Sequence, residues 1–295
     1  MSKVDKQHSA PRPRRRLVKR ELVDAFIDLV LAQGAAHYRE FAWRDTRDPY
    51  ATAISEIMLQ QTQAPRVVGF FDRWMERFPT ADALAAAPLD LVLENWQGLG
   101  YNRRALQVKR LAETISSDYS GVLPVGYRDL LELPGVGPST AAGIVIFAHD
   151  EPALYYETNV RTVYLHEVWP KAEEVHDRDV LEVAGRVLDR VVARGISPRR
   201  WTYALLDYGA WLKKEFPNPS RRSKQYVKHA KFEGSNRQKR GAVLRAVVGD
   251  PGRSVAEYAE AIGYDLATTE RVLAALGEDG FLACDDSGCW GVPGA

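Results

Sequence analysis

The apolar residues of this 295-residue chain recur at helical spacing and almost nowhere at strand spacing. In the first such segment an apolar side chain stands at every fourth position, at Val18, Leu22, Phe26 and Val30. This repeat places the side chains on one face of an α-helix. Runs rich in Val, Ile and Thr between turns are scarce before the far C-terminus. The sequence therefore predicts a helical bundle with short loops over residues 20–210.

Turn-forming residues divide the predicted bundle. Asp48 followed by Pro49 is typical of the start of a helix, because proline is well tolerated in the first turn. Thr80, two residues after Phe78, is placed to cap the helix that follows. Glycine-rich stretches at 98–100 and 134–140 predict two tight connections.

The last sixty residues have a pattern of their own. Helices are expected over 240–248 and 255–262, the second capped by Ser254, and a third is expected to begin at Thr268 or Thr269. Two strand-like runs, 280–284 and 289–292, flank a turn at 285–288. Three helices followed by a β-hairpin are typical of a winged helix, so residues 237–295 are predicted to form a small winged-helix-like module.

The net charge of +1 conceals two strongly basic segments. Residues 1–20 contain eight Lys/Arg and one acidic residue, and residues 213–240 contain ten and two. The rest of the chain is therefore acidic. Residues 1–16 are predicted to be a disordered basic tail and residues 213–236 a basic linker. Such segments suit a polyanionic partner, although solvated faces and a simple tail explain them as well.

Several classes of protein are disfavoured by composition. No apolar run approaches the ~20 residues that span a bilayer, and no apolar segment follows the basic N-terminus as in a secretory signal. A cytoplasmic location is therefore expected. The chain has two cysteines, Cys284 and Cys289, which are too few for a four-ligand zinc site or an iron–sulfur cluster. No metal is expected.

A glycine-rich string at 133–143 is the first motif with chemical content. Gly135 and Gly137 permit a tight hairpin without side-chain bulk, and a helix is expected to begin at Ser139 or Thr140. The free N–H groups of that helix would accept a phosphate without reading sequence. An ordinary helix–helix turn is the alternative.

A second motif, at 55–63, places one carboxylate beside two amides. Glu56 lies in an otherwise uncharged helix, where a carboxylate is costly to bury unless it is paired or used. Gln60 and Gln61 follow it and could contact base edges or fill the gap left by an extruded base. A solvated polar face is the alternative.

Two further strings complete the set. Glu157 and Asn159 stand where a helix is expected to begin, so capping by Glu157 is the alternative to a catalytic role.

The loop at 96–105 would present Leu99 and Tyr101 beside Arg103. An apolar or aromatic side chain beside cations is what insertion into the minor groove requires, with core packing as the alternative.

Together these four strings resemble the helix-hairpin-helix DNA glycosylases in order and spacing, over about residues 20–212. The resemblance is greatest to MutY-type adenine glycosylases and smaller to endonuclease III. It implies a mainly α, two-lobed helical glycosylase fold with DNA bound between the lobes, here followed by the winged-helix-like module. The glycosylase domain is expected over residues 17–212.

The resemblance implies roles for individual residues. Glu56 matches the catalytic acid/base, and Glu157 and Asn159 match groups at the reaction centre. The remaining matches concern binding: Gln60, Gln61, Leu99, Tyr101, Arg103, Gly135, Gly137, Ser139 and Thr140 to DNA, and Arg39 and Trp43 to the wall of the base pocket.

The chain also departs from the family pattern. Glu157 stands in place of an Asp, and Ser139 in place of the lysine that makes bifunctional relatives lyases. The four cluster-binding cysteines are absent, and Leu212 with the basic stretch 213–240 occupies their place, as in a clusterless branch. The C-terminal module does not resemble the nudix-like domain of MutY.

The resemblance therefore implies a monofunctional glycosylase of base excision repair that removes adenine mispaired with guanine or 8-oxoguanine, without a cofactor. The expected partner is double-stranded DNA with a mispaired or damaged base, bound by a monomer at the nucleoid, with no membrane. Excision of thymine or uracil opposite guanine, or of another damaged base, is the alternative. A non-catalytic DNA-binding protein is the second.

Overall fold

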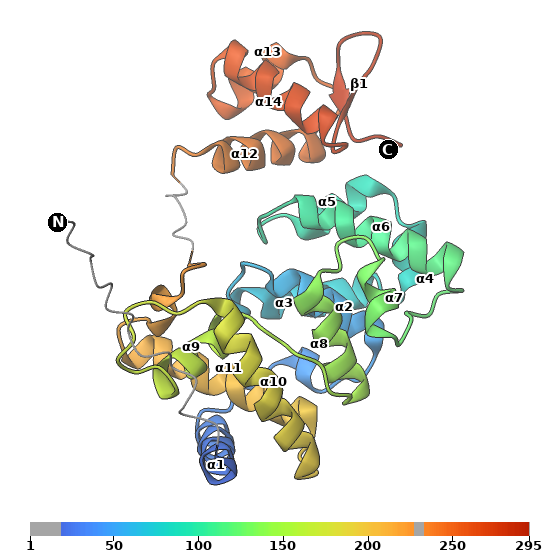
Figure 1. The fold of residues 1–295 in the computed structure, drawn as a ribbon. Coiled ribbons are helices and arrows are strands. Elements are labelled where there is room, and N and C mark those ends of the chain that lie inside the picture. The colour runs from blue at the N-terminus through green and yellow to red at the C-terminus, as the bar shows by residue number, and fades with distance from the viewer. Residues whose placement is uncertain (1–18, 227–232, 295) are drawn as a thin grey trace, which may run out of the picture. The chain divides into compact units, whose positions relative to one another are not determined.

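Helices dominate the computed structural model of this chain, which describes residues 19–226 and 233–294 (Figure 1). The predicted basic tail, 1–16, lies outside the described residues, as does part of the predicted linker. The chain divides into two units that interleave in sequence: residues 1–40 with 150–227, and residues 41–149 with 228–295. The predicted mainly α fold is confirmed.

The first unit is built from long helices around one apolar core. Its helices are α1 (Arg20–Ala36), α9 (Thr158–Glu167), α10 (Asp177–Ala193) and α11 (Pro198–Glu215), followed by the short 3₁₀ turn η2 (Pro219–Arg222). Glycines let the helices approach closely. A Cβ at Gly209 of α11 would lie 2.6 Å from the carbonyl carbon of Asn159, and one at Gly34 of α1 would lie 2.5 Å from the Cβ of Ala204. Since real Cβ atoms do not approach so closely, only glycine fits these positions.

The second unit begins with η1 (Ala42–Arg44) and seven further helices. These are α2 (Pro49–Leu59), α3 (Ala64–Arg77), α4 (Ala81–Ala86), α5 (Leu89–Trp96), α6 (Arg103–Asp118), α7 (Tyr127–Leu131) and α8 (Pro138–His149). Nearly every side chain of α2 and α8 is buried. A helix that is apolar all round must be enclosed by its neighbours, and these two helices pack on each other.

Two predicted helix starts are confirmed. The carboxylate of Asp48 accepts hydrogen bonds from the backbone N–H groups of Tyr50 (3.1 Å) and Ala51 (3.2 Å), capping α2. The hydroxyl of Thr80 accepts from the N–H of Ala83 (3.1 Å) and caps α4.

The chain ends, within the second unit, in three helices and a β-hairpin. These are α12 (Asn236–Gly249), α13 (Val255–Ile262), α14 (Leu266–Glu278), β1 (Ala283–Cys284) and β2 (Trp290–Gly291), with antiparallel strands and Cys284 opposite Trp290. The predicted start of α14 at Thr268 or Thr269 is wrong. Asp265 caps this helix by accepting from the N–H of Thr268 at 2.8 Å, so the threonines lie inside it. Over the described residues, no helix combines the length and the apolar character needed to cross a membrane.

Candidate active site

Glu56 occupies a seat made by a glycine on the neighbouring helix. It lies in the second half of α2 and is only 8% exposed. A Cβ added to Gly143 of α8 would lie 2.7 Å from the carboxyl carbon of Glu56. The missing side chain of Gly143 is therefore what leaves room for this carboxyl group. Sequence reasoning identified Glu56 but missed Gly143, because only the packing of α2 on α8 relates the two.

The two amides after Glu56 have different environments. The Gln60 side-chain amide donates a hydrogen bond to the Thr140 hydroxyl (3.1 Å), which ties the end of α2 to α8. Gln61 follows in a left-handed conformation (φ 55°) with an exposed side chain. That conformation is uncommon for residues other than glycine and is held only by its surroundings. The turn thus fixes one amide internally and directs the next toward solvent.

The loop between α5 and α6 presents one aromatic side chain. Gly98 (φ 93°) and Gly100 (φ 81°) form the turn, and Tyr101 is also left-handed (φ 50°) and 38% exposed. The expectation that Leu99 is presented as well is not met, since Leu99 is 3% exposed. As an apolar side chain it packs inward.

Arg104 holds this loop to the end of α2. Its guanidinium donates to the carbonyls of Ile57 (2.8 Å), Met58 (2.7 Å) and Gln60 (2.7 Å), which end α2. It also donates to the Gly100 carbonyl (2.9 Å). Burial lowers the pKa of Arg104 to about 10, so the side chain remains charged at neutral pH.

The clamp made by Arg104 brings together the two residues predicted to enter DNA. Gln61 and Tyr101 lie forty positions apart in sequence, yet the turns that carry them bind the same guanidinium. We call them the wedge pair. Sequence reasoning missed Arg104, and its one signal was an arginine beside Arg103 at the start of a helix.

The predicted glycine hairpin precedes α8. Gly135 is left-handed (φ 76°), and a Cβ there would lie 2.8 Å from the Cβ of Gln107, so both conformation and space require glycine. Gly137 is not left-handed, and a Cβ there would meet no atom within 4 Å. Ser139 is exposed in the first turn of α8, whereas Thr140 is buried and engaged with Gln60. Of these four residues, Ser139 is thus the exposed one, and both glycines are partly buried.

Glu157 caps a helix in the first unit. Its carboxylate accepts from the backbone N–H groups of Asn159 (2.7 Å) and Val160 (3.0 Å) at the start of α9. The Asn159 amide also donates to it (3.3 Å). The carbonyl oxygen of that amide is buried and accepts no hydrogen bond from the described residues. The capping role raised from sequence is therefore present, and a buried acceptor lies beside it.

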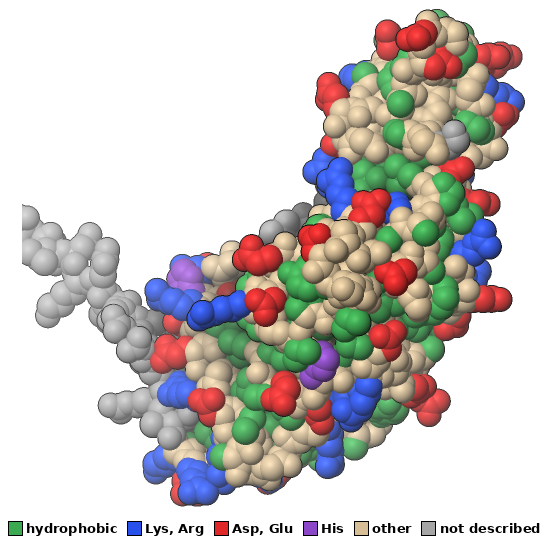
Figure 2. Space-filling view, turned by 90° about the vertical axis from the view of Figure 1, so that its right-hand side faces the viewer, with side chains coloured by type: hydrophobic (Ala, Val, Ile, Leu, Met, Phe, Trp, Pro, Cys, Tyr) green, Lys and Arg blue, Asp and Glu red, His purple; other side chains and the backbone are tan. Residues whose placement is uncertain are grey.

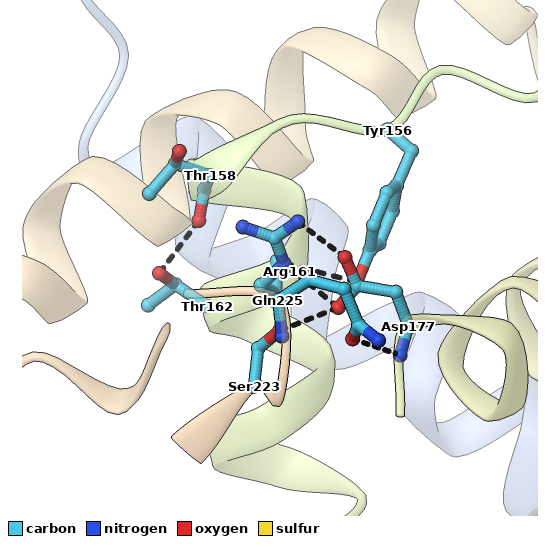
Figure 3. A network of polar contacts seen from close by, with 7 residues as sticks. All are labelled: Tyr156, Thr158, Arg161, Thr162, Asp177, Ser223 and Gln225. Carbon is cyan, nitrogen blue, oxygen red and sulfur yellow. Dashed lines mark hydrogen bonds and ion pairs between the residues drawn. The ribbon is translucent and has the colours of Figure 1, made fainter. Parts of the chain in front are cut away.

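A polar network supports this part of the first unit. Figure 3 shows it centred on Asp177, whose carboxylate accepts hydrogen bonds from Tyr156, Arg161 and Ser223. The backbone N–H of Asp177 donates to the side-chain oxygen of Gln225. The Tyr156 hydroxyl donates to Asp177 at 3.0 Å and accepts from Arg161 at 3.2 Å. Burial raises the pKa of Tyr156 well above its ordinary value. Because Tyr156 directly precedes Glu157, the network fixes the approach to α9.

Lys213, at the end of α11, adds a charge to the surroundings of Glu157. Burial lowers its pKa, the negative charge of Glu157 opposes this, and the positive charge of Arg39 reinforces it. Sequence reasoning counted Lys213 only as part of a basic linker.

Arg39 and Trp43, the predicted pocket wall, belong to different units. Arg39 donates to the buried carboxylate of Asp207 on α11 (2.7 Å). Trp43 is 6% exposed and stacks on Phe41 with ring centroids 4.6 Å apart. Both side chains are therefore held rigidly, each within its own unit.

The donor set does not fit an iron–sulfur cluster. Cys284 and Cys289 are free thiols in the C-terminal hairpin, and four thiolates are needed. The described residues contain no cluster of His, Cys, Asp or Glu that could hold a metal ion. In the segment after α11, Arg222 instead donates to the carbonyls of Leu165 and Trp169 (2.6 Å each) near the end of α9.

Comparisons with known proteins agree on one family. Residues 54–201 match the HhH-GPD superfamily of base excision DNA repair proteins. An adenine DNA glycosylase of Mycobacterium tuberculosis is 32% identical over 290 residues, which cover 90% of this chain and 92% of that protein. A thymine/uracil-DNA glycosylase of Methanothermobacter thermautotrophicus is 32% identical over 135 residues, covering 45% of this chain and 61% of that protein.

A similar solved structure is that of a thermostable thymine-DNA glycosylase. It superposes with a TM-score of 0.55 at 26% identity, over 64% of this chain and 86% of that one.

Proposed function

This chain belongs to the HhH-GPD superfamily of base excision DNA repair proteins, and we propose that it is a glycosylase that removes adenine mispaired with guanine or 8-oxoguanine. The similarity to an adenine DNA glycosylase over nine-tenths of the chain supports this substrate. The observation that carries the proposal is the seat of Glu56. A carboxyl group enclosed between two largely apolar helices, shortly before Gln61 in the sequence, is costly to bury unless it is paired or used.

Excision begins with extrusion of the target base, which costs a few kcal/mol. The wedge pair, Gln61 and Tyr101, holds the gap open. Glu56 then protonates the purine at N7 or positions the attacking water. Glu157 stabilises the cationic sugar of the transition state electrostatically. Two carboxyl groups with separate roles are common in enzymes that cleave glycosidic bonds.

We also propose that the enzyme acts without lyase chemistry. Ser139 stands where bifunctional relatives carry a lysine, and a hydroxyl cannot form a Schiff base with the abasic sugar. Borohydride should therefore trap no covalent adduct between enzyme and DNA. A strong trapped adduct would overturn this part of the proposal.

Removal of thymine or uracil opposite guanine is the second candidate. It is supported by the thymine/uracil-DNA glycosylase relative and by the likeness to the thymine-DNA glycosylase structure. The replacement of an Asp by Glu157 also suits a changed substrate.

A panel of duplexes separates the candidates. Each carries one mispair, namely adenine opposite guanine, adenine opposite 8-oxoguanine, thymine opposite guanine or uracil opposite guanine. Abasic products are cleaved with alkali after a single turnover. Faster excision of adenine than of thymine or uracil is expected. Excision of the pyrimidines alone would favour the second candidate, and no excision from any duplex would refute both.

A further inference from the structure

A cavity of about 590 Å³ lies within the second unit, beside the wedge pair. Its walls come from the α5–α6 loop and from α12 and α14 of the C-terminal module. Its apolar lining includes Trp96, Leu244, Leu276 and Phe281. A volume of this size falls in the range of pockets that hold small organic groups.

The rim of this cavity is strongly cationic. Among the described residues that line it are six arginines, Arg66, Arg103, Arg104, Arg237, Arg240 and Arg245, and one acidic residue, Asp279. Asp279 forms an ion pair with Arg103, which joins α6 to the C-terminal module, and another with Arg240 of α12 inside that module. One carboxylate cannot neutralise six guanidinium groups, so the cavity favours an anionic ligand.

The C-terminal module contacts Tyr101 of the wedge pair directly. The Arg237 guanidinium donates a hydrogen bond to the Tyr101 hydroxyl (3.2 Å) and lies 5.9 Å from the centre of its ring. Gln61 and Tyr101 both line the cavity. A group bound here would therefore lie next to the side chains proposed to enter the base stack.

The rest of the C-terminal module is unsuited to bind DNA. Residues 250–295 contain nine acidic residues and two arginines. The third helix of a winged helix ordinarily enters the major groove with its N-terminal residues, yet α14 begins with Asp265 as its cap and Glu270 in its second turn. Figure 2 shows red side chains at the far end of the module, at the top of the view, and blue ones beside green at its base.

These observations point to a site that rests on the proposed function but goes beyond it. We propose that the cavity binds one unstacked nucleotide of the DNA beside the wedge pair. The phosphate lies on the arginines of α12, and the base lies on the apolar lining. The C-terminal module thus binds DNA through α12 at the lesion, and α14 does not act as a recognition helix.

The test uses the full chain with Glu56→Gln, so that binding is measured without turnover. Arg237→Ala and Arg245→Ala are combined, since both arginines come from α12 and line the cavity. The plot of log affinity against log salt concentration should lose a slope of about 1 to 2, roughly one for each phosphate contact removed. Arg271→Ala, which removes an exposed arginine of α14 outside the cavity, is the matched control and should leave the slope unchanged.

A second readout reports the base itself. In duplexes with 2-aminopurine at successive positions around the mispair, fluorescence should rise on binding at one position and rise less with the double variant. An unchanged slope in the double variant, or no brightening at any position, would overturn the proposal. Both readouts measure binding, so they remain informative even if the unmutated protein excises no base, the result that would refute the proposed function instead.

Discussion

The two carboxylates assigned to the reaction are supported in opposite ways. Glu56, in the second unit, is enclosed by apolar helices and sits in the space left by Gly143. Glu157, in the first unit, is held by backbone N–H groups at a helix start, beside the network around Asp177. A carboxyl group can thus be positioned by packing or by hydrogen bonds. The two supports respond differently to substitution, because only Glu157 also stabilises a helix.

Replacing Glu56 with Gln should have the largest effect on activity. Gln has nearly the same shape but cannot donate a proton as a carboxylic acid, so single-turnover excision should fall by roughly 10²- to 10⁴-fold. The melting temperature and DNA affinity should stay close to those of the unmutated protein, since the seat is still filled. Near-normal turnover would remove Glu56 from the mechanism.

Gly143→Ala should test how packing positions Glu56 while leaving the Glu56 side chain itself unchanged. The new Cβ would overlap the Glu56 carboxyl group, and overpacking of this kind costs about 1–3 kcal/mol of folding stability. Displacement of the carboxylate by about 1 Å should slow excision by up to roughly 10²-fold.

The matched control for this substitution is Gly185→Ala in α10, where a Cβ would meet nothing within 4 Å. It should stabilise the protein slightly, because alanine favours a helix by about 1 kcal/mol over glycine. Equal stability and activity for the two variants would show that packing against α8 does not position Glu56.

Two substitutions of Glu157 should separate its catalytic role from its role as the cap of α9. Glu157→Gln keeps an acceptor for the N–H groups of α9 but loses the charge, so excision should fall by roughly tenfold, equivalent to ~1.4 kcal/mol, with little change in stability. Glu157→Ala should in addition lose about 1 kcal/mol of stability with the cap. Denaturant unfolding and single-turnover rates measure both. If Gln and Ala variants were equally stable, the cap would be irrelevant and the contrast with Glu56 would disappear.

The sequence predicts the structure best where a feature depends only on residues that are close together in the chain. Helix starts at Asp48 and Thr80 follow from a capping side chain and its next few residues, and both are confirmed. The start of α14 was missed because Thr268 and Asp265 are both good caps, and only the backbone geometry distinguishes them. The four motifs were likewise readable as strings, and the family that they indicated is confirmed.

What supports those motifs could not be read from the sequence. Gly143 lies against Glu56, Arg104 binds Met58 and Asp177 binds Tyr156. Each of these partners is more than 20 positions away in the sequence, and no local pattern indicates the contacts. The exposure of Leu99 was mispredicted for the same reason, since burial depends on what packs over the loop. The interleaving of the two units, in which the chain leaves the first unit after residue 40 and returns at 150, is also a property of tertiary structure.

The smallest effect is expected at the edge of the polar network. Ser223 is buried, and its hydroxyl donates to Asp177 at 2.7 Å. Ser223→Ala leaves that carboxylate bound to Arg161 and Tyr156, so stability should fall by only about 1 kcal/mol and excision should stay within about twofold, a change of ~0.4 kcal/mol. Ser117→Ala on the exposed face of α6 is the control and should change neither. A tenfold loss of excision in Ser223→Ala alone would mean that the network positions Glu157 during the reaction. Hydrogen bonds would then hold Glu157 as tightly as packing holds Glu56.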